Sequence, residues 1–129
     1  MGRKLCACLF FTVLCSLTLL GQSKKNVIDS LKLVISSSVK DSNLVHNHLL
    51  LATALFDVNI KASGANANKA HRISKQLSFL SGSAESLLIL GSIDFKQGKL
   101  HLALSHMKQA LTLFNKQNNL SKVAQTHTE

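Results

Sequence analysis

A chain of 129 residues with 46% hydrophobic residues and a formal net charge of +9 is long enough to form one small domain. The positive charge is scattered along the chain. It does not form the basic stripe with stacking aromatic residues that a nucleic-acid-binding surface requires, so no nucleic-acid partner is expected. All three cysteines, Cys6, Cys8 and Cys15, lie close to the amino terminus, so no disulfide is expected in the rest of the chain.

Residues 1–21 have the pattern of a secretory signal peptide. Arg3 and Lys4 form a basic head, and residues 5–20 are an uncharged apolar run of about 16 residues, which is short for a membrane span of about 20. Cleavage after Gly21 fits the small residue that such sites prefer, and an uncleaved signal anchor is the alternative. The pattern predicts export to the periplasm or the extracellular space.

A series of amphipathic helices is expected after this leader. Apolar residues at helical spacing predict helices near residues 26–39, 43–59, 66–80, 83–97, 100–116 and 120–128, joined by short turns. Ser83 is expected to cap the fourth of these helices, because a hydroxyl can accept a hydrogen bond from an orphan backbone amide. Residues 62–68 contain Gly and Asn, which are poor helix formers, so a frayed or shortened helix is expected there.

The segment over residues 87–114 predicts one antiparallel helix pair. Gly91 and Ala103 are small where two helices would cross closely, and Gly98 supplies a residue that adopts positive φ and ends the first helix at low cost. Apolar stripes on the two helices are expected to be buried. The residues of these stripes are Leu87, Leu90, Leu100, Leu104, Leu111 and Phe114.

This pair has a degraded copy upstream. Residues 51–56 align with residues 90–95 at an offset of about 39, and residues 69–73 align with residues 109–113 at about 40. An offset of this size lies within the range expected for arrays of helical repeats. The comparison therefore predicts two successive helix pairs of similar structure.

The same offset carries Leu80 onto Leu120, which predicts that a third unit opens at residue 120 and is cut short at Glu129. Helical repeats bury a continuous core only by stacking, and three or more units are usually needed. We therefore expect a partial chain. The alternative is that residues 119–128 form a capping helix with a polar outer face.

The second pair carries a recognisable motif. Its residues are Leu90, Gly91, Gly98, Ala103, Met107 and Ala110. This motif resembles that of the tetratricopeptide repeat (TPR) family. The resemblance implies an all-α fold in which antiparallel helix-turn-helix pairs stack as a short TPR-like solenoid, with a packing helix at residues 22–41 and repeats at about 42–81, 82–119 and from 120 onward.

The chain departs from the family pattern in three respects, since one Tyr position of the motif is changed, no Trp or Tyr occurs anywhere in the chain, and Pro is absent. Asp94 stands where the family has Tyr, and the neighbouring Phe95 is expected to supply the aromatic ring after a small rotation.

The resemblance also implies a binding surface. In proteins of this family the first helix of each pair lines a concave groove that holds an extended peptide or a partner helix. Carried over to this chain, the groove residues are His46, Leu49, Thr53, Asp57, Glu85, Leu88, Ser92 and Lys96. Phe56 and Phe95 belong either to this groove or to the core, and burial by a neighbouring helix is the alternative for Leu49 and Leu88.

The sequence offers little support for catalysis or metal binding. Two residues apart on a helix, His46 and His48 would point in directions about 200° apart, and His101 and His106 are placed little better for shared ligation. No nucleophile elbow, phosphate-binding glycine loop or zinc-protease motif occurs in the chain. We therefore expect no enzyme activity, no cofactor and no bound metal.

These patterns favour a protein-protein interaction module of an exported TPR protein. The leader, the helix that follows it and the long repeats resemble the exported N-terminal region of Bacteroidetes-type sensor proteins, which suggests the sensory fragment of a longer signalling receptor. A free-standing secreted or periplasmic scaffold is the alternative, and a secreted enzyme is the third hypothesis. The expected partner is a protein or peptide, with membrane contact only through the leader or a later span. Self-association is a further hypothesis, through Leu111, Phe114 and Leu120.

Overall fold

The computed structural model describes residues 21–126, and in this range the chain forms helices and no strands. The predicted signal peptide, with its three cysteines, lies outside the described residues except for Gly21. A helix over residues 21–37 comes first in the described range. It is followed by α2 (Ser42–Leu55), α3 (Ile60–Gln76), α4 (Leu80–Lys96) and α5 (Leu100–Thr126). The all-α fold class predicted from the sequence is confirmed.

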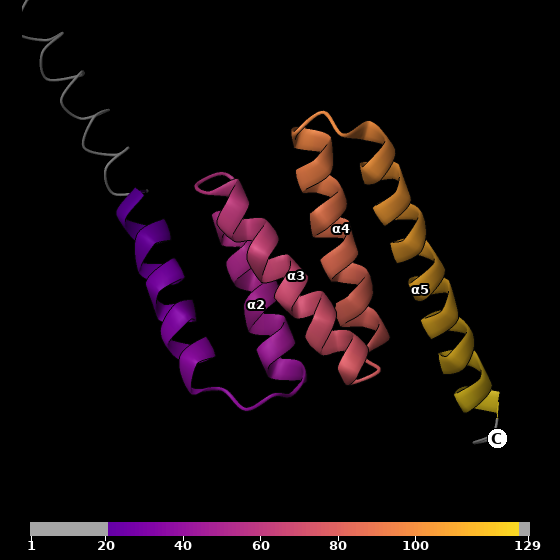
Figure 1. Cartoon of the computed structure of the whole chain (residues 1–129). Coiled ribbons are helices and arrows are strands. Elements are labelled where there is room, and N and C mark those ends of the chain that lie inside the picture. Colours follow the sequence, from indigo (N-terminus) through magenta and orange to yellow (C-terminus); the bar gives the residue numbers. More distant parts are fainter. Residues whose placement is uncertain (1–20, 127–129) are drawn as a thin grey trace, which may run out of the picture.

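Neighbouring helices are antiparallel and lie side by side in chain order, from the indigo helix over residues 21–37 to the yellow α5 (Figure 1). Each of α3, α4 and α5 packs against the helix before it, and α2 also packs against α4. Within the described residues α3 and α5 make no such contact. Helices α2 and α4 therefore form the closely packed side of the row, and α3 and α5 form the more open side.

Three apolar clusters hold neighbouring helices together. Ile28 in the helix over residues 21–37 packs with Leu51 and Leu55 of α2. A second cluster joins α2 to α3, and its buried members are Val45, Leu49, Ala70 and Ile73. The third joins α4 to α5, and its buried members are Ala84, Leu87 and Ala110. Each cluster buries apolar surface between adjacent helices, which is the main stabilising term of such a fold.

The turns before α4 and α5 have the same backbone geometry. The amide of Phe79 donates to the carbonyl of Ser74 at 2.8 Å, and twenty residues later the amide of Lys99 donates to the carbonyl of Asp94 at the same distance. Gly98 has the positive φ (75°) expected at the end of a helix, and Ser78 takes that conformation in the earlier turn (φ 54°). The predicted role of Gly98 is confirmed.

The close crossing of α4 and α5 is also confirmed. A Cβ atom on Gly91 would lie 3.3 Å from the carbonyl oxygen of Ala103 and 3.2 Å from Cγ of Met107. A side chain at this position would require the Ala103 backbone to move by a few tenths of an ångström, and backbone yields less easily than a flexible side chain. The small pair predicted from the sequence therefore sets the distance between α4 and α5.

The prediction of a weak helix over residues 62–68 was wrong. These residues lie within the continuous helix α3, which begins after Asn59, whose side chain accepts a hydrogen bond from the amide of Ala62 at 3.0 Å. Ser63 is fully buried and donates to the carbonyl of Ala52 in α2 at 2.7 Å. The small side chains let α3 approach α2 closely, and this tertiary contact outweighs their low helix propensity.

Two predicted helix boundaries also need correction. Helix α4 begins at Leu80, after Phe79, with no side-chain cap, so Ser83 lies inside the helix and does not cap it. The break expected between residues 116 and 120 is absent, because α5 runs without interruption through Thr126. No Gly or Pro occurs at residues 117–119 to stop the helix, and residues 120–126 continue the second helix of the pair.

The apolar stripe predicted on α5 is largely exposed. Leu100 and Leu111 are each 61% exposed and Leu104 is 52% exposed, whereas Ala103 and Ala110 face α4 and are buried. Phe95 is likewise exposed, so it does not replace the missing Tyr ring. Instead, Oδ2 of Asp94 lies 2.8 Å from Nδ1 of His106 in α5. A polar contact between the helices thus occupies the place where an aromatic ring was expected.

Candidate partner-binding groove

A cavity of about 330 Å³ lies between α2 and α4 on the closely packed side of the row. Its walls are Thr53, Phe56, Asp57, Leu88, Ile89 and Ser92. Both helices present one face to it, since residues three or four apart share a helix face. The cavity therefore combines apolar walls with hydroxyl and carboxylate groups at its edges.

Both hydroxyls of this cavity are bonded to their own helices. Thr53 Oγ1 donates to the carbonyl of Leu49 at 3.0 Å, and Ser92 Oγ donates to the carbonyl of Leu88 at 2.9 Å. Each hydroxyl oxygen still has lone pairs that can accept a hydrogen bond. The two side chains can therefore receive amide N–H groups from a bound peptide.

An ion pair joins α4 to the end of α2 beside this cavity. Lys96 Nζ donates to Asp57 Oδ1 at 2.9 Å, and the same ammonium group lies 4.6 Å from the centre of the Phe56 ring. The hydrogen bond and the positive charge of Lys96 lower the pKa of the Asp57 carboxyl from its ordinary value of 3.8. Asp57 is therefore ionised at neutral pH, and the pair remains open to solvent.

Five of the eight predicted groove residues meet here. Thr53, Asp57, Leu88 and Ser92 line the cavity, and Lys96 bonds to Asp57. Residues 57 and 96 are 39 positions apart, so the ion pair connects equivalent positions of the two helix pairs. The offset found in the sequence thus corresponds to a direct contact between α2 and α4.

The other three predicted residues lie elsewhere. Leu49 is a buried core residue that packs with Val45, so its placement in the groove was wrong. Glu85 accepts a hydrogen bond from Ser81 at 2.8 Å, and neither it nor the exposed His46 lines the cavity. The groove is accordingly shorter than the one expected from the sequence.

Two cavity residues were missed or left open by the sequence. Ile89 was missed, because one more apolar residue in the run from Leu87 to Leu90 carries no signal of which face it occupies. Phe56, left open between groove and core, lines the cavity.

The histidines of the described range have separate surroundings. His48 is buried and its Nδ1 lies 2.9 Å from Asn66 Oδ1 in α3, whereas His46 is exposed. Among residues 21–126 no group of three or more His, Cys, Asp or Glu side chains is placed to hold a metal ion. The same residues contain no helix that is long and apolar enough to cross a membrane.

The described residues define an all-α chain of packed helix pairs with a cavity between the first helices of successive pairs. Comparisons of the sequence with family models and curated proteins, and of the fold with solved structures, found no match.

Proposed function

We propose that this protein is an exported protein-interaction module of the TPR type, and that it binds an extended segment of a partner protein in the groove between α2 and α4. The observation that carries the proposal is the cavity of about 330 Å³ on that face. It lies between equivalent helices of two successive pairs, where stacked helical repeats form their concave binding surfaces. The module would be the sensory fragment of a longer signalling receptor, and a free-standing secreted or periplasmic scaffold is the alternative.

The chemistry of the cavity suggests how a peptide would lie in it. Leu88, Ile89 and the Phe56 ring offer apolar contact for one side chain of the partner. The hydroxyls of Thr53 and Ser92 can accept hydrogen bonds from the peptide backbone. The exposed Lys96–Asp57 pair offers one charge of each sign beside the cavity and so favours a polar residue next to the apolar one.

A random peptide library displayed on phage and selected on residues 22–129 tests the proposal. We expect peptides with one apolar anchor residue, and we expect Leu88→Arg to weaken their binding by about tenfold or more, because it places a charge in the apolar cavity. The matched control is Leu102→Arg, since Leu102 on α5 is exposed to a similar extent (48% against 40%) and does not line the cavity. Affinities are measured by fluorescence anisotropy, and circular dichroism checks that both variants keep their helices.

Charge reversal gives a second measurement on the same peptides. Lys96→Glu removes the ion pair and places two carboxylates together, so we expect peptides that contact this end to lose affinity. Lys108→Glu, on the exposed surface of α5, makes the same change in net charge away from the groove. Selected peptides that bind all four variants equally would place the contact on another surface and refute the proposed groove.

A further inference from the structure

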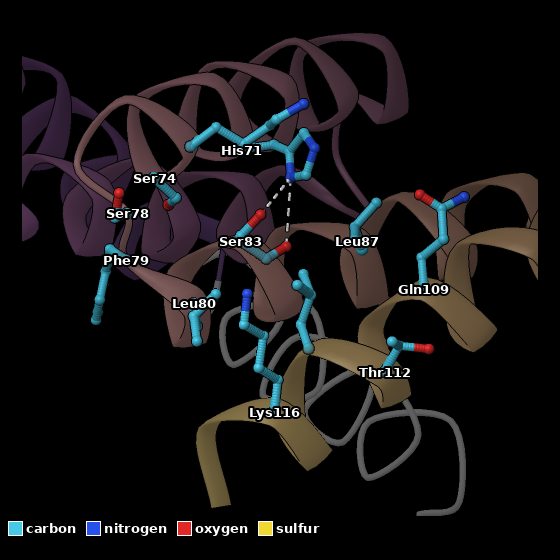
Figure 2. Close-up of a pocket in the computed structure, with 12 residues that line it drawn as sticks. His71, Ser74, Ser78, Phe79, Leu80, Ser83, Leu87, Gln109, Thr112 and Lys116 are labelled. Atoms are coloured by element: carbon cyan, nitrogen blue, oxygen red, sulfur yellow. Dashed lines mark hydrogen bonds between the residues drawn. The ribbon is translucent and has the colours of Figure 1, made fainter. Parts of the chain in front are cut away.

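A second and larger cavity lies on the opposite, more open side of the row. Its volume is about 520 Å³, within the range of about 300–1,000 Å³ typical of small-molecule sites. Residues of α3, α4, α5 and the turn between α3 and α4 line it, because in the described residues α3 and α5 both pack on α4 and do not pack on each other. Figure 2 shows these residues converging from the three helices.

The cavity has an apolar part that can hold a hydrocarbon chain. Its apolar side chains are Phe79, Leu80, Leu87 and Leu113. Leu87 belongs to the buried cluster between α4 and α5, and Phe79 packs against the cluster between α2 and α3. Phe79, Leu87 and Leu113 are held by core packing, so this part of the apolar wall is preformed and a ligand would not have to order it.

The charged side chains at the cavity are all basic. Lys75 from α3 and Lys116 from α5 line it, and within the part of the chain that the structure describes no Asp or Glu lines it. In Figure 2 the Lys116 side chain reaches from α5 across the cavity toward α4. Two ammonium groups beside an apolar wall favour a ligand with one negative charge and an apolar body.

The other polar side chains that line the cavity are neutral. The Ser83 hydroxyl lies 3.0 Å from Nδ1 of His71, and burial lowers the pKa of His71 from its ordinary value of 6.5. The ring is therefore uncharged at neutral pH. Ser74 also lines the cavity, and its fully buried hydroxyl has no hydrogen-bond partner among the described residues. A buried polar group without a partner is uncommon and marks unused hydrogen-bonding capacity in this wall.

We propose that this cavity binds a free carboxylate that carries an unbranched apolar chain, such as a medium-chain fatty acid. The chain would lie against the four apolar side chains, and the carboxylate would accept hydrogen bonds from the ammonium groups of Lys75 and Lys116. This site is on the opposite side of α4 from the peptide groove, and the inference does not depend on the proposed function.

Titration with octanoate, followed by amide chemical shifts and by calorimetry, tests the assignment. We expect saturable binding with the largest shifts at the lining residues Leu80, Leu87 and Leu113. Octan-1-ol is expected to bind more weakly, since it lacks the charge, and octylammonium is expected not to bind, since it carries the opposite charge. Equal binding of all three compounds would overturn the role of the lysines.

A pair of double variants separates the site from general charge effects. Lys75→Gln with Lys116→Gln should weaken octanoate binding by about tenfold or more, because both charge-assisted hydrogen bonds are lost. Lys99→Gln with Lys108→Gln makes the same change in net charge outside the cavity and should leave binding unchanged. Equal affinity in both double variants would refute the proposal. Binding to phosphatidylglycerol vesicles without binding to octanoate would also refute it and would indicate a membrane surface instead.

Discussion

Helices α3 and α5 hold the same position in successive pairs, yet they present different residues at equivalent places. In α3 the relevant face consists of Ile60, Gly64, Ala67 and His71, and forty residues later in α5 it consists of Leu100, Leu104, Met107 and Leu111. The face of α3 is covered by α4. Gly64 lies against Ile93, and His71 contacts Ser83. The corresponding face of α5 is largely open in the described residues: its four side chains are 39–61% exposed, although Met107 also lies against Gly91 of α4.

The difference shows that side-chain size follows the number of neighbouring helices. Helix α3 packs between α2 and α4, and its buried residues include Ser63, Ala67 and Ala70, which allow close approach on two sides. In the described residues helix α5 packs on α4 alone, and its buried contact positions, Ala103 and Ala110, are small. Although α3 and α5 have equivalent positions in the two helix pairs, α5 should therefore tolerate larger side chains at more positions than α3.

The largest predicted effect follows from Ala67, which is 0% exposed, and its equivalent Met107, which is 39% exposed. Ala67→Leu should lower the free energy of unfolding by about 2 kcal/mol, because the added carbons have no space between α3 and its neighbours. Met107→Leu should change it by less than about 0.5 kcal/mol, since the volume is nearly conserved and the side chain is partly exposed. Urea denaturation followed by circular dichroism measures both. If Ala67→Leu lowered the free energy of unfolding no more than Met107→Leu, α3 would not be enclosed between α2 and α4.

Substitutions in the turns before α4 and α5 should change the free energy of unfolding by a smaller amount, and in opposite directions. Ser78→Gly should raise the free energy of unfolding by about 1 kcal/mol, because it relieves a side chain held at positive φ. Gly98→Ala should lower it by about the same amount in the equivalent turn. Thermal and urea unfolding of the two variants measure the changes, and the equivalence of the turns fails if both variants shift stability in the same direction.

The half-buried His71 predicts a modest dependence of stability on pH. Burial lowers its pKa below 6.5 in the folded protein, so the unfolded chain binds the proton more readily. This contribution to stability is present above pH 6.5 and is lost as the pH falls through 6.5 toward the folded value. We expect His71→Gln to lose less stability between pH 7.5 and pH 5.5 than the unchanged chain in urea titrations. Parallel losses in the two proteins would assign the pH dependence to other groups.

The smallest expected effect is weak self-association through the exposed face of α5. A stripe on one helix buries less area than a stable interface needs, so association should be detectable only at high protein concentration. Replacing both Leu104 and Leu111 by Glu should abolish it in sedimentation equilibrium, because charges would interrupt the apolar stripe. Leu33→Glu with Val39→Glu is the control, since both residues are exposed near the other end of the row. A monomer at all concentrations would contradict the expectation.

Local signals in the sequence were sufficient for part of the fold. Gly91, Gly98 and Ala103 are all small, and each is explained by its immediate surroundings, a close crossing or a positive φ. The offset of 39 residues between Asp57 and Lys96 is likewise visible in the sequence. The two side chains form an ion pair because the equivalent helices α2 and α4 lie next to each other.

Other features depended on partners distant in the sequence. The segment over residues 62–68 has low helix propensity, and only its contact with α2, including the Ser63 hydrogen bond to Ala52, explains why it is helical. Leu49 and Leu88 look alike in the sequence, yet the first is buried against Ile73 and the second borders the groove. Periodicity identifies an apolar face but does not state which neighbour covers it.

The pairing of α2 with α4, without a matching contact between α3 and α5, makes the row stiffer in one direction of bending than in the other. Flexing that brings α2 and α4 together would compress side chains already in contact, and close-packed interiors resist compression. Flexing that brings α3 toward α5 would first take up the open space over α4. The row of helices should therefore bend more easily toward the side of the cavity between α3 and α5 than toward the side where α2 packs on α4.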